Sequence, residues 1–71
     1  MLVGTVKWFS TQKGFGYIVT EGYDKEVLVH MSALRRAGIA KLIEGQRVRF
    51  ELERDRKTGR ESASELRIEP D

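Results

Sequence analysis

The chain has 71 residues, with 13 Lys and Arg against 11 Asp and Glu, for a formal net charge of +2. This length allows one domain, residues 1–71, with one small apolar core. Having no cysteine and one histidine excludes disulfides, thiolate metal sites and multi-histidine metal clusters, so we expect no metal and no cofactor. No apolar run is long enough for export or for crossing a membrane, and the expected location is the cytoplasm.

Runs of strand-forming residues separated by short turns dominate the first half of the chain. The predicted strands cover residues 2–9, 15–20 and 26–30. The turns between them cover residues 10–14 and 21–25, and Gly14 is available for a positive φ. Because these turns are short, the three strands are expected to form an antiparallel meander.

A short helical pattern follows the third strand at residues 32–38. Ser32 is expected to cap its amino end and Gly38 to end it. Because so short a helix is unstable alone, it must pack against the rest of the fold.

Two further strands complete the pattern. Residues 46–53 alternate cleanly between apolar and polar side chains, as a half-buried strand does. A hairpin turn at residues 56–60 leads to a last strand at residues 61–68, which Pro70 ends.

Basic residues crowd the segment before the last strand, where they alternate with acidic ones. The basic residues are Arg54, Arg56, Lys57 and Arg60. A solvated turn is the first interpretation of this mixture, and a loop that contacts phosphates is the alternative.

Five short strands in a chain of this length cannot bury two separate sheets. A sheet curled into a small closed barrel buries one core and protects its edges. The predicted interior consists of Val6, Ile18, Val27, Val29, Val48, Phe50 and Leu66. The side chains of opposite parity on the second and third strands then share the outer face, and these are Phe15, Tyr17, Leu28 and His30.

The segment from Lys13 to Ile18 carries two aromatic rings between glycines. Because residues two apart share a face of a strand, Phe15 and Tyr17 stand side by side, and the glycines leave the approach to them open. Paired rings on a strand more often belong to a core, but here other residues already fill the core. Adjacent outer rings near a cation suit stacking on single-stranded nucleic acid.

Four segments in this order resemble the cold-shock domain family over residues 2–68. They are Gly4–Phe9, Lys13–Ile18, Val27–Ser32 and Glu44–Phe50. The resemblance implies an all-β fold, a five-stranded antiparallel OB-fold barrel with a short helical turn after the third strand. It also implies binding of single-stranded RNA and DNA, with a preference for pyrimidine-rich strands, and a role as an RNA chaperone that affects transcription and translation. A monomer is the default expectation.

The family's strand-contacting residues correspond to Lys7, Trp8, Lys13, Phe15, Tyr17 and His30 of this chain, and Phe9 borders the same patch. Strict alternation would turn Trp8 to the inner face with Val6. A bend or bulge in the first strand, as the family shows, would turn Trp8 outward.

Three positions that are usually aromatic in the family are aliphatic here, namely Leu28, Met31 and Ile39, and Ser10 replaces a usual asparagine. An aliphatic side chain keeps apolar contact with a base but loses the flat π face. If each change loses on the order of 1 kcal/mol, the three together weaken binding by about a hundredfold. We therefore expect a working binder with a shorter or weaker footprint than a typical member.

Two alternatives belong to other functional classes. An enzyme would need clustered carboxylates, a metal set or a nucleophile with its base, whereas the acidic residues here are dispersed, so neither catalysis nor a small-molecule substrate is expected. A protein-interaction module stays open, because Leu28, Met31 and Ile39 could form an apolar patch for a protein partner. Reading a duplex would need a recognition helix longer than residues 32–37.

Overall fold

Residues 2–22 and 25–69 are described by a computed structural model, and they form five strands and one helix. The elements are β1 (Leu2–Ser10), β2 (Phe15–Thr20), β3 (Glu26–His30), α1 (Met31–Ala37), β4 (Arg47–Arg54) and β5 (Glu61–Ile68). Each predicted strand is confirmed to within one residue at either end. The predicted turn at residues 21–25 includes Tyr23 and Asp24, which lie outside the described residues, as does the predicted strand end at Pro70.

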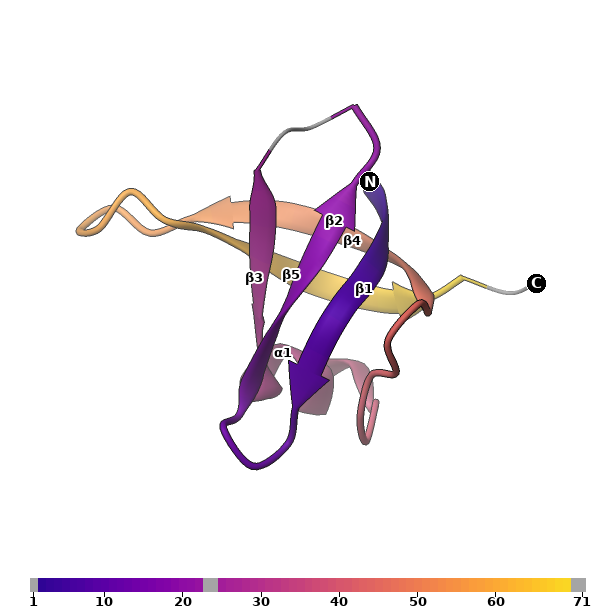
Figure 1. Cartoon of the computed structure of the whole chain (residues 1–71). Coiled ribbons are helices and arrows are strands. Elements are labelled where there is room, and N and C mark those ends of the chain that lie inside the picture. The colour runs from indigo at the N-terminus through magenta and orange to yellow at the C-terminus, as the bar shows by residue number, and fades with distance from the viewer. Residues whose placement is uncertain (1, 23–24, 70–71) are drawn as a thin grey trace.

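The strands close into a barrel in the order β1-β2-β3-β5-β4 (Figure 1). The predicted meander of β1, β2 and β3 is confirmed, and β4 is antiparallel to both of its neighbours. The predicted five-stranded barrel is confirmed, and it departs from the expected antiparallel pairing at one place, because β3 and β5 run parallel, with Leu28 opposite Ser62. Five is an odd number, so strand directions cannot alternate at every neighbour around a closed ring of five.

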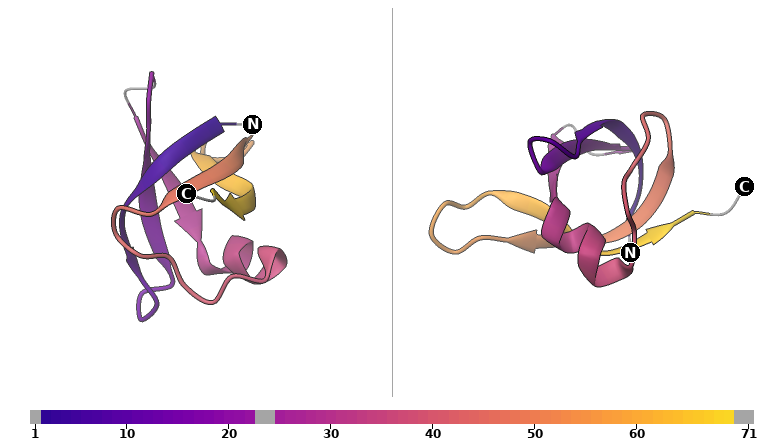
Figure 2. Two further views of the ribbon diagram at one scale, coloured as in Figure 1. Left: turned by 90° about the vertical axis from the view of Figure 1, so that its right-hand side faces the viewer. Right: turned by 90° about the horizontal axis from the view of Figure 1, so that it is seen from below.

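The barrel interior holds the apolar core. All seven residues predicted for the interior are buried, and Leu34, Leu42 and Ala63 join them. Leu34 comes from α1, which lies across one end of the barrel beside β3 and β5 (Figure 2). The helix therefore closes the core at that end, as its short length requires.

Helix α1 begins one residue earlier than predicted, and Ser32 does not cap it. Its first residue is Met31, whose backbone N–H donates to the Gly14 carbonyl at 2.9 Å, and the preceding His30 makes no side-chain cap. This hydrogen bond satisfies a donor of the first turn and ties the helix to the β1–β2 turn. Gly38 ends the helix as predicted, with a φ of 74° and its N–H donating to the Arg35 carbonyl.

Two strands contain irregularities that change which side chains face inward. In β1 the register with β2 shifts between Val6 and Trp8, which leaves Lys7 as an extra residue. In β5 the register with β4 shifts between Ser64 and Arg67, opposite Arg49 and Glu51. Both are β-bulges, which reverse the alternation of side chains beyond the extra residue.

Candidate nucleic-acid interface

Three aromatic rings gather on the outer face of β1 and β2. Because Lys7 is an extra residue, Trp8 faces outward opposite Tyr17, which confirms the expected bulge. The Trp8 ring centroid lies 5.5 Å from that of Phe15 and 5.4 Å from that of Tyr17, and Phe15 and Tyr17 are 6.1 Å apart. The three rings are tilted or edge-on to one another and half-buried, so each ring leaves part of its surface to solvent.

The same outer face continues onto β3. Phe15 pairs with His30 and Tyr17 with Leu28 across the antiparallel ladder, so these side chains are cross-strand neighbours. His30 is exposed and Leu28 is half-buried. We call the five residues together the stacking surface: Trp8, Phe15, Tyr17, Leu28 and His30.

Phe9 lies on the other side of the sheet from Trp8. It pairs with Gly16 and packs against the core, partly buried. A Cβ on Gly16 would lie 2.3 Å from the Trp8 carbonyl oxygen and 2.7 Å from the Phe9 ring. Gly16 therefore leaves room for the backbone and ring of β1, and its missing side chain does not open the approach to the stacking surface.

A tight turn that contains Lys13 precedes the first ring of β2. The Ser10 hydroxyl accepts a hydrogen bond from the Lys13 backbone N–H at 3.1 Å, and the Gly14 N–H donates to the Ser10 carbonyl at 2.8 Å. Gly14 has a φ of 82°, as the sequence predicts. The serine that stands in place of the usual asparagine therefore still holds this turn, and the Lys13 side chain is exposed, two positions before Phe15 in the chain.

Lys7 is paired with a carboxylate that the sequence had not singled out. Its Nζ donates to Glu26 Oε2 at 2.9 Å, across β2, and the two side chains are 51% and 41% exposed. An exposed ion pair of this kind contributes little, about 0.2–1 kcal/mol, so a phosphate can compete with Glu26 for the lysine. No sequence signal identifies the pairing, because the two residues are 19 positions apart on strands that are not neighbours.

Met31 and Ile39 lie at the start of α1 and just beyond its end. Both are half-buried and pack against the core, so part of each side chain is covered. Leu28 is half-buried as well, so none of the three side chains of the suggested apolar patch is fully exposed.

The β4–β5 hairpin extends beyond the barrel (Figure 1), and Asp55, Thr58 and Arg60 of this segment line one hollow with Leu28 and His30 of the stacking surface. Residues 54–60 are exposed, as predicted for a solvated turn. The Asp55 carboxylate organises the turn by accepting the backbone N–H groups of Lys57 at 2.8 Å and Thr58 at 3.3 Å. Arg60 lines two shallow hollows that both contain Leu28. The basic residues of this segment were the sequence signal that could have placed Arg60 near the ligand. Their alternation with acidic residues favoured a solvated turn instead.

Among residues 2–22 and 25–69, no three His, Asp or Glu side chains come together to hold a metal ion. Over the same residues, no helix has the length and apolar character needed to cross a membrane. The arrangement offers rings, cations and apolar side chains to a ligand.

Comparison with known proteins agrees with this geometry. The family model of the 'Cold-shock' DNA-binding domain matches residues 2–68. The cold shock protein CspA of Rhizobium meliloti is 50% identical over 64 residues, which cover 90% of this chain and 93% of that protein. The cold shock-like protein CspA of Rickettsia bellii is 52% identical over 67 residues, covering 94% and 93%. The chain therefore belongs to the cold-shock domain family, whose members bind nucleic acid.

Proposed function

We propose that this chain binds single-stranded RNA and DNA by stacking bases on Trp8, Phe15, Tyr17 and His30. The observation that carries the proposal is the group of three outer rings with centroids 5.4–6.1 Å apart on a barrel whose core is filled by other side chains. A ring that is half-exposed at that position has apolar surface for a base. Lys7 and Lys13, at the edges of the rings, bind the phosphates.

The cellular role that follows is that of an RNA chaperone and a regulator of transcription or translation. A protein that binds single strands and not duplexes shifts weak RNA hairpins toward the open form by mass action. The preferred strands are pyrimidine-rich, and the protein acts in the cytoplasm as a monomer and as a single domain spanning residues 1–71. It binds without chemical change to the nucleic acid and without a cofactor.

The footprint is shorter or weaker than that of a family member with more aromatic residues. Leu28 extends the stacking surface with an aliphatic side chain, whereas Phe9, Met31 and Ile39, the other positions that the family resemblance suggested, pack partly against the core. A protein-interaction module is not proposed, because Met31 and Ile39 are partly covered by the core.

Fluorescence of Trp8 tests the proposal directly, because this is the one tryptophan of the chain. We expect strong quenching by hexathymidine, little quenching by a duplex of equal length, and partial persistence at moderate salt. Equal responses to both ligands, or no response at millimolar hexathymidine, would contradict single-strand stacking.

A matched pair of variants on β2 separates stacking from general effects of mutation. Phe15→Ala should weaken hexathymidine binding by about tenfold or more, since stacking contributes about 1–3 kcal/mol per base. Val19→Ala removes a side chain that is 46% exposed on the same outer face but beyond the rings. It should leave affinity within twofold of the unmodified chain.

A further inference from the structure

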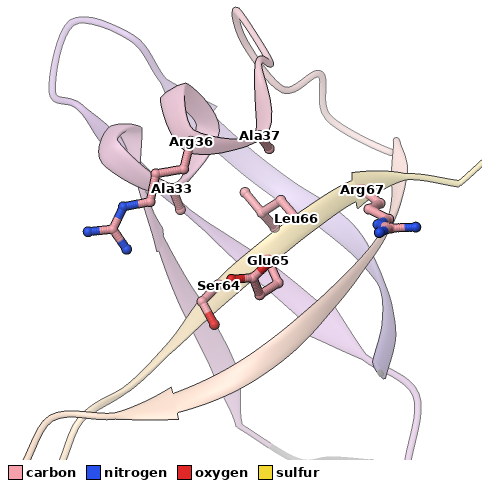
Figure 3. A pocket seen from close by; sticks show the side chains of 7 residues that line it. All are labelled: Ala33, Arg36, Ala37, Ser64, Glu65, Leu66 and Arg67. Atoms are coloured by element: carbon pink, nitrogen blue, oxygen red, sulfur yellow. The ribbon is translucent and has the colours of Figure 1, made fainter.

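A further hollow lies between α1 and β5, away from the stacking surface. It has a volume of about 260 Å³ and is lined by Ala33, Arg36 and Ala37 of α1 and by Ser64–Arg67 of β5. In Figure 3 the helix lies above β5, and the strands that carry the stacking surface pass behind. The barrel order separates β2 from β5 by β3 on one side and by β1 and β4 on the other, so the two surfaces face different directions.

The bulge in β5 shapes this hollow. Glu65 has a φ of 51°, the one non-glycine positive φ among the described residues, and Ala63 and Leu66 are both buried although they are three positions apart. The extra residue turns Leu66 inward beneath the helix. Small side chains, Ala33 and Ala37, face it from α1 and leave the space open.

Two arginines stand at opposite ends of the hollow (Figure 3). Arg36 and Arg67 are exposed, and within the described part of the chain neither forms an ion pair. Lys7 and Arg49, in contrast, are each bonded to a glutamate. Glu65 lies between the two arginines but pairs with neither, so an anion is favoured at the ends of the hollow and disfavoured at its centre.

The chemistry of the lining selects the kind of ligand. A guanidinium offers a planar fork of donors that matches a phosphate. The lining contains no aromatic ring, so it cannot stack a base, and the Ser64 hydroxyl already donates to the Glu51 carbonyl at 3.3 Å. What remains is two cations at the ends of the hollow, with the Glu65 carboxylate between them beside the apolar Leu66, Ala33 and Ala37. This spacing suits a chain whose repeated negative charges reach both ends, with no base required.

We propose that the hollow between α1 and β5 is a second binding surface for nucleic acid, on which Arg36 and Arg67 hold phosphates of the sugar–phosphate backbone without contacting bases. The inference rests on the proposed function, since it assigns the same ligand class to another face. One protein then holds two strands, or two segments of one strand, on different sides of the barrel. The second contact is weaker and more sensitive to salt, because it lacks stacking.

The test is a nuclear magnetic resonance titration with hexathymidine carried past one equivalent at about 50 mM salt. The first equivalent should shift the Trp8 indole signal, and further addition should shift the Arg36 and Arg67 side-chain signals and the Ala33 and Ala37 amides. An abasic hexamer of deoxyribose phosphates should produce the second set of shifts and not the first. Raising the salt to about 200 mM should remove the shifts of the arginine surface before those of Trp8.

Substitutions give the matched comparison. The double variant Arg36→Gln with Arg67→Gln should weaken the second phase by about tenfold and leave the Trp8 phase within twofold. Glu65→Gln should strengthen the second phase. Arg35→Gln with Lys41→Gln removes the same charge from exposed positions outside the hollow and should retain both phases.

Three results would overturn this second surface. They are a titration with no second phase, a second phase that persists in the Arg36 and Arg67 double variant, and equal shifts produced by a glutamate hexapeptide. Absence of the Trp8 phase, in contrast, would reject stacking as the proposed function. The abasic hexamer would still report on the arginines in that case.

Discussion

The bulges in β1 and β5 are the same backbone device with opposite results. In β1 the extra residue Lys7 turns Trp8 out of the barrel, and in β5 the extra residue at Glu65 turns Leu66 into it. The side chain moved outward joins two rings on an open face, whereas the side chain moved inward completes the core. A single inserted residue thus decides whether a large apolar side chain serves binding or stability.

The largest effect that tests the difference between the two bulges is expected at Leu66. Leu66→Ala should lower the free energy of unfolding by about 3 kcal/mol, because the side chain is 4% exposed and its removal leaves a cavity. Urea denaturation measures this loss. Ile68→Ala on the same strand, where the side chain is 41% exposed, should cost less than about 1 kcal/mol. Similar losses in both variants would mean that the β5 bulge does not direct Leu66 into the core energetically.

The corresponding change in β1 should affect binding instead of folding. Trp8→Ala should weaken binding to a labelled hexathymidine by about thirtyfold, which corresponds to about 2 kcal/mol of stacking. Fluorescence anisotropy of the labelled strand replaces the lost tryptophan signal. A loss of stability as large as that of Leu66→Ala, with affinity retained, would show that Trp8 serves the core.

Binding by the stacking surface should improve when its aliphatic residue, Leu28, is replaced by an aromatic one. Leu28→Phe adds a ring beside Tyr17 and should tighten binding to hexathymidine by about fivefold, on the order of 1 kcal/mol. The same anisotropy measurement reports the change. An unaltered affinity would mean that the aliphatic replacement does not weaken this surface.

The ion pair beside the rings should give a smaller effect. Glu26→Gln removes the partner of Lys7 and should tighten binding about two- to threefold at low salt, in line with an exposed pair. The gain should shrink as salt rises, because free Lys7 binds the strand electrostatically. Weaker binding in Glu26→Gln would assign Glu26 a direct contact with the ligand.

The smallest effect concerns pH and the pair that joins β4 to the end of β5. The hydrogen bond from Arg49 lowers the pKa of Glu69 and raises that of Arg49, and Arg49 Nη2 lies 3.2 Å from Glu69 Oε1. A lowered carboxyl pKa stabilises the fold above the ordinary value and loses that stabilisation as pH falls through the lowered one. Urea midpoints of the unmodified chain and of Glu69→Gln should therefore differ slightly at pH 7 and converge in acid. A difference that grows in acid would contradict this linkage.

Local patterns in the sequence were sufficient for most of the fold. Alternation in residues 46–53 predicts the inner face of β4, and the fold buries Val48 and Phe50. The bulge in β1 was predictable because Trp8 had the wrong parity for an outer ring. The bulge in β5 was not, because neither a glycine nor an aromatic residue marks Glu65, and glutamate rarely adopts the left-handed backbone found there.

The remaining differences arise from contacts between distant residues. Helix α1 begins at Met31 because its N–H meets the Gly14 carbonyl, an interaction that no local capping pattern encodes. The placement of Phe15 and Tyr17 on one face follows from parity and could be predicted, whereas Trp8 joins them only through the β1 bulge that the family resemblance implied. The pairing of Lys7 with Glu26 and the position of Arg60 beside Leu28 depend on how the strands wrap around the barrel.

The way in which the barrel closes determines where it can open locally. Within the described residues, β3 and β5 share a single registered pair, Leu28 with Ser62, whereas the antiparallel neighbours share four or more. The contact between β3 and β5 therefore has the fewest ladder hydrogen bonds to resist local opening of the barrel. Leu28 belongs both to this contact and to the stacking surface, so a nucleic-acid strand bound over Leu28 would oppose the local separation of β3 and β5. Ligand binding would then slow the hydrogen exchange of the backbone amides of β3 and β5.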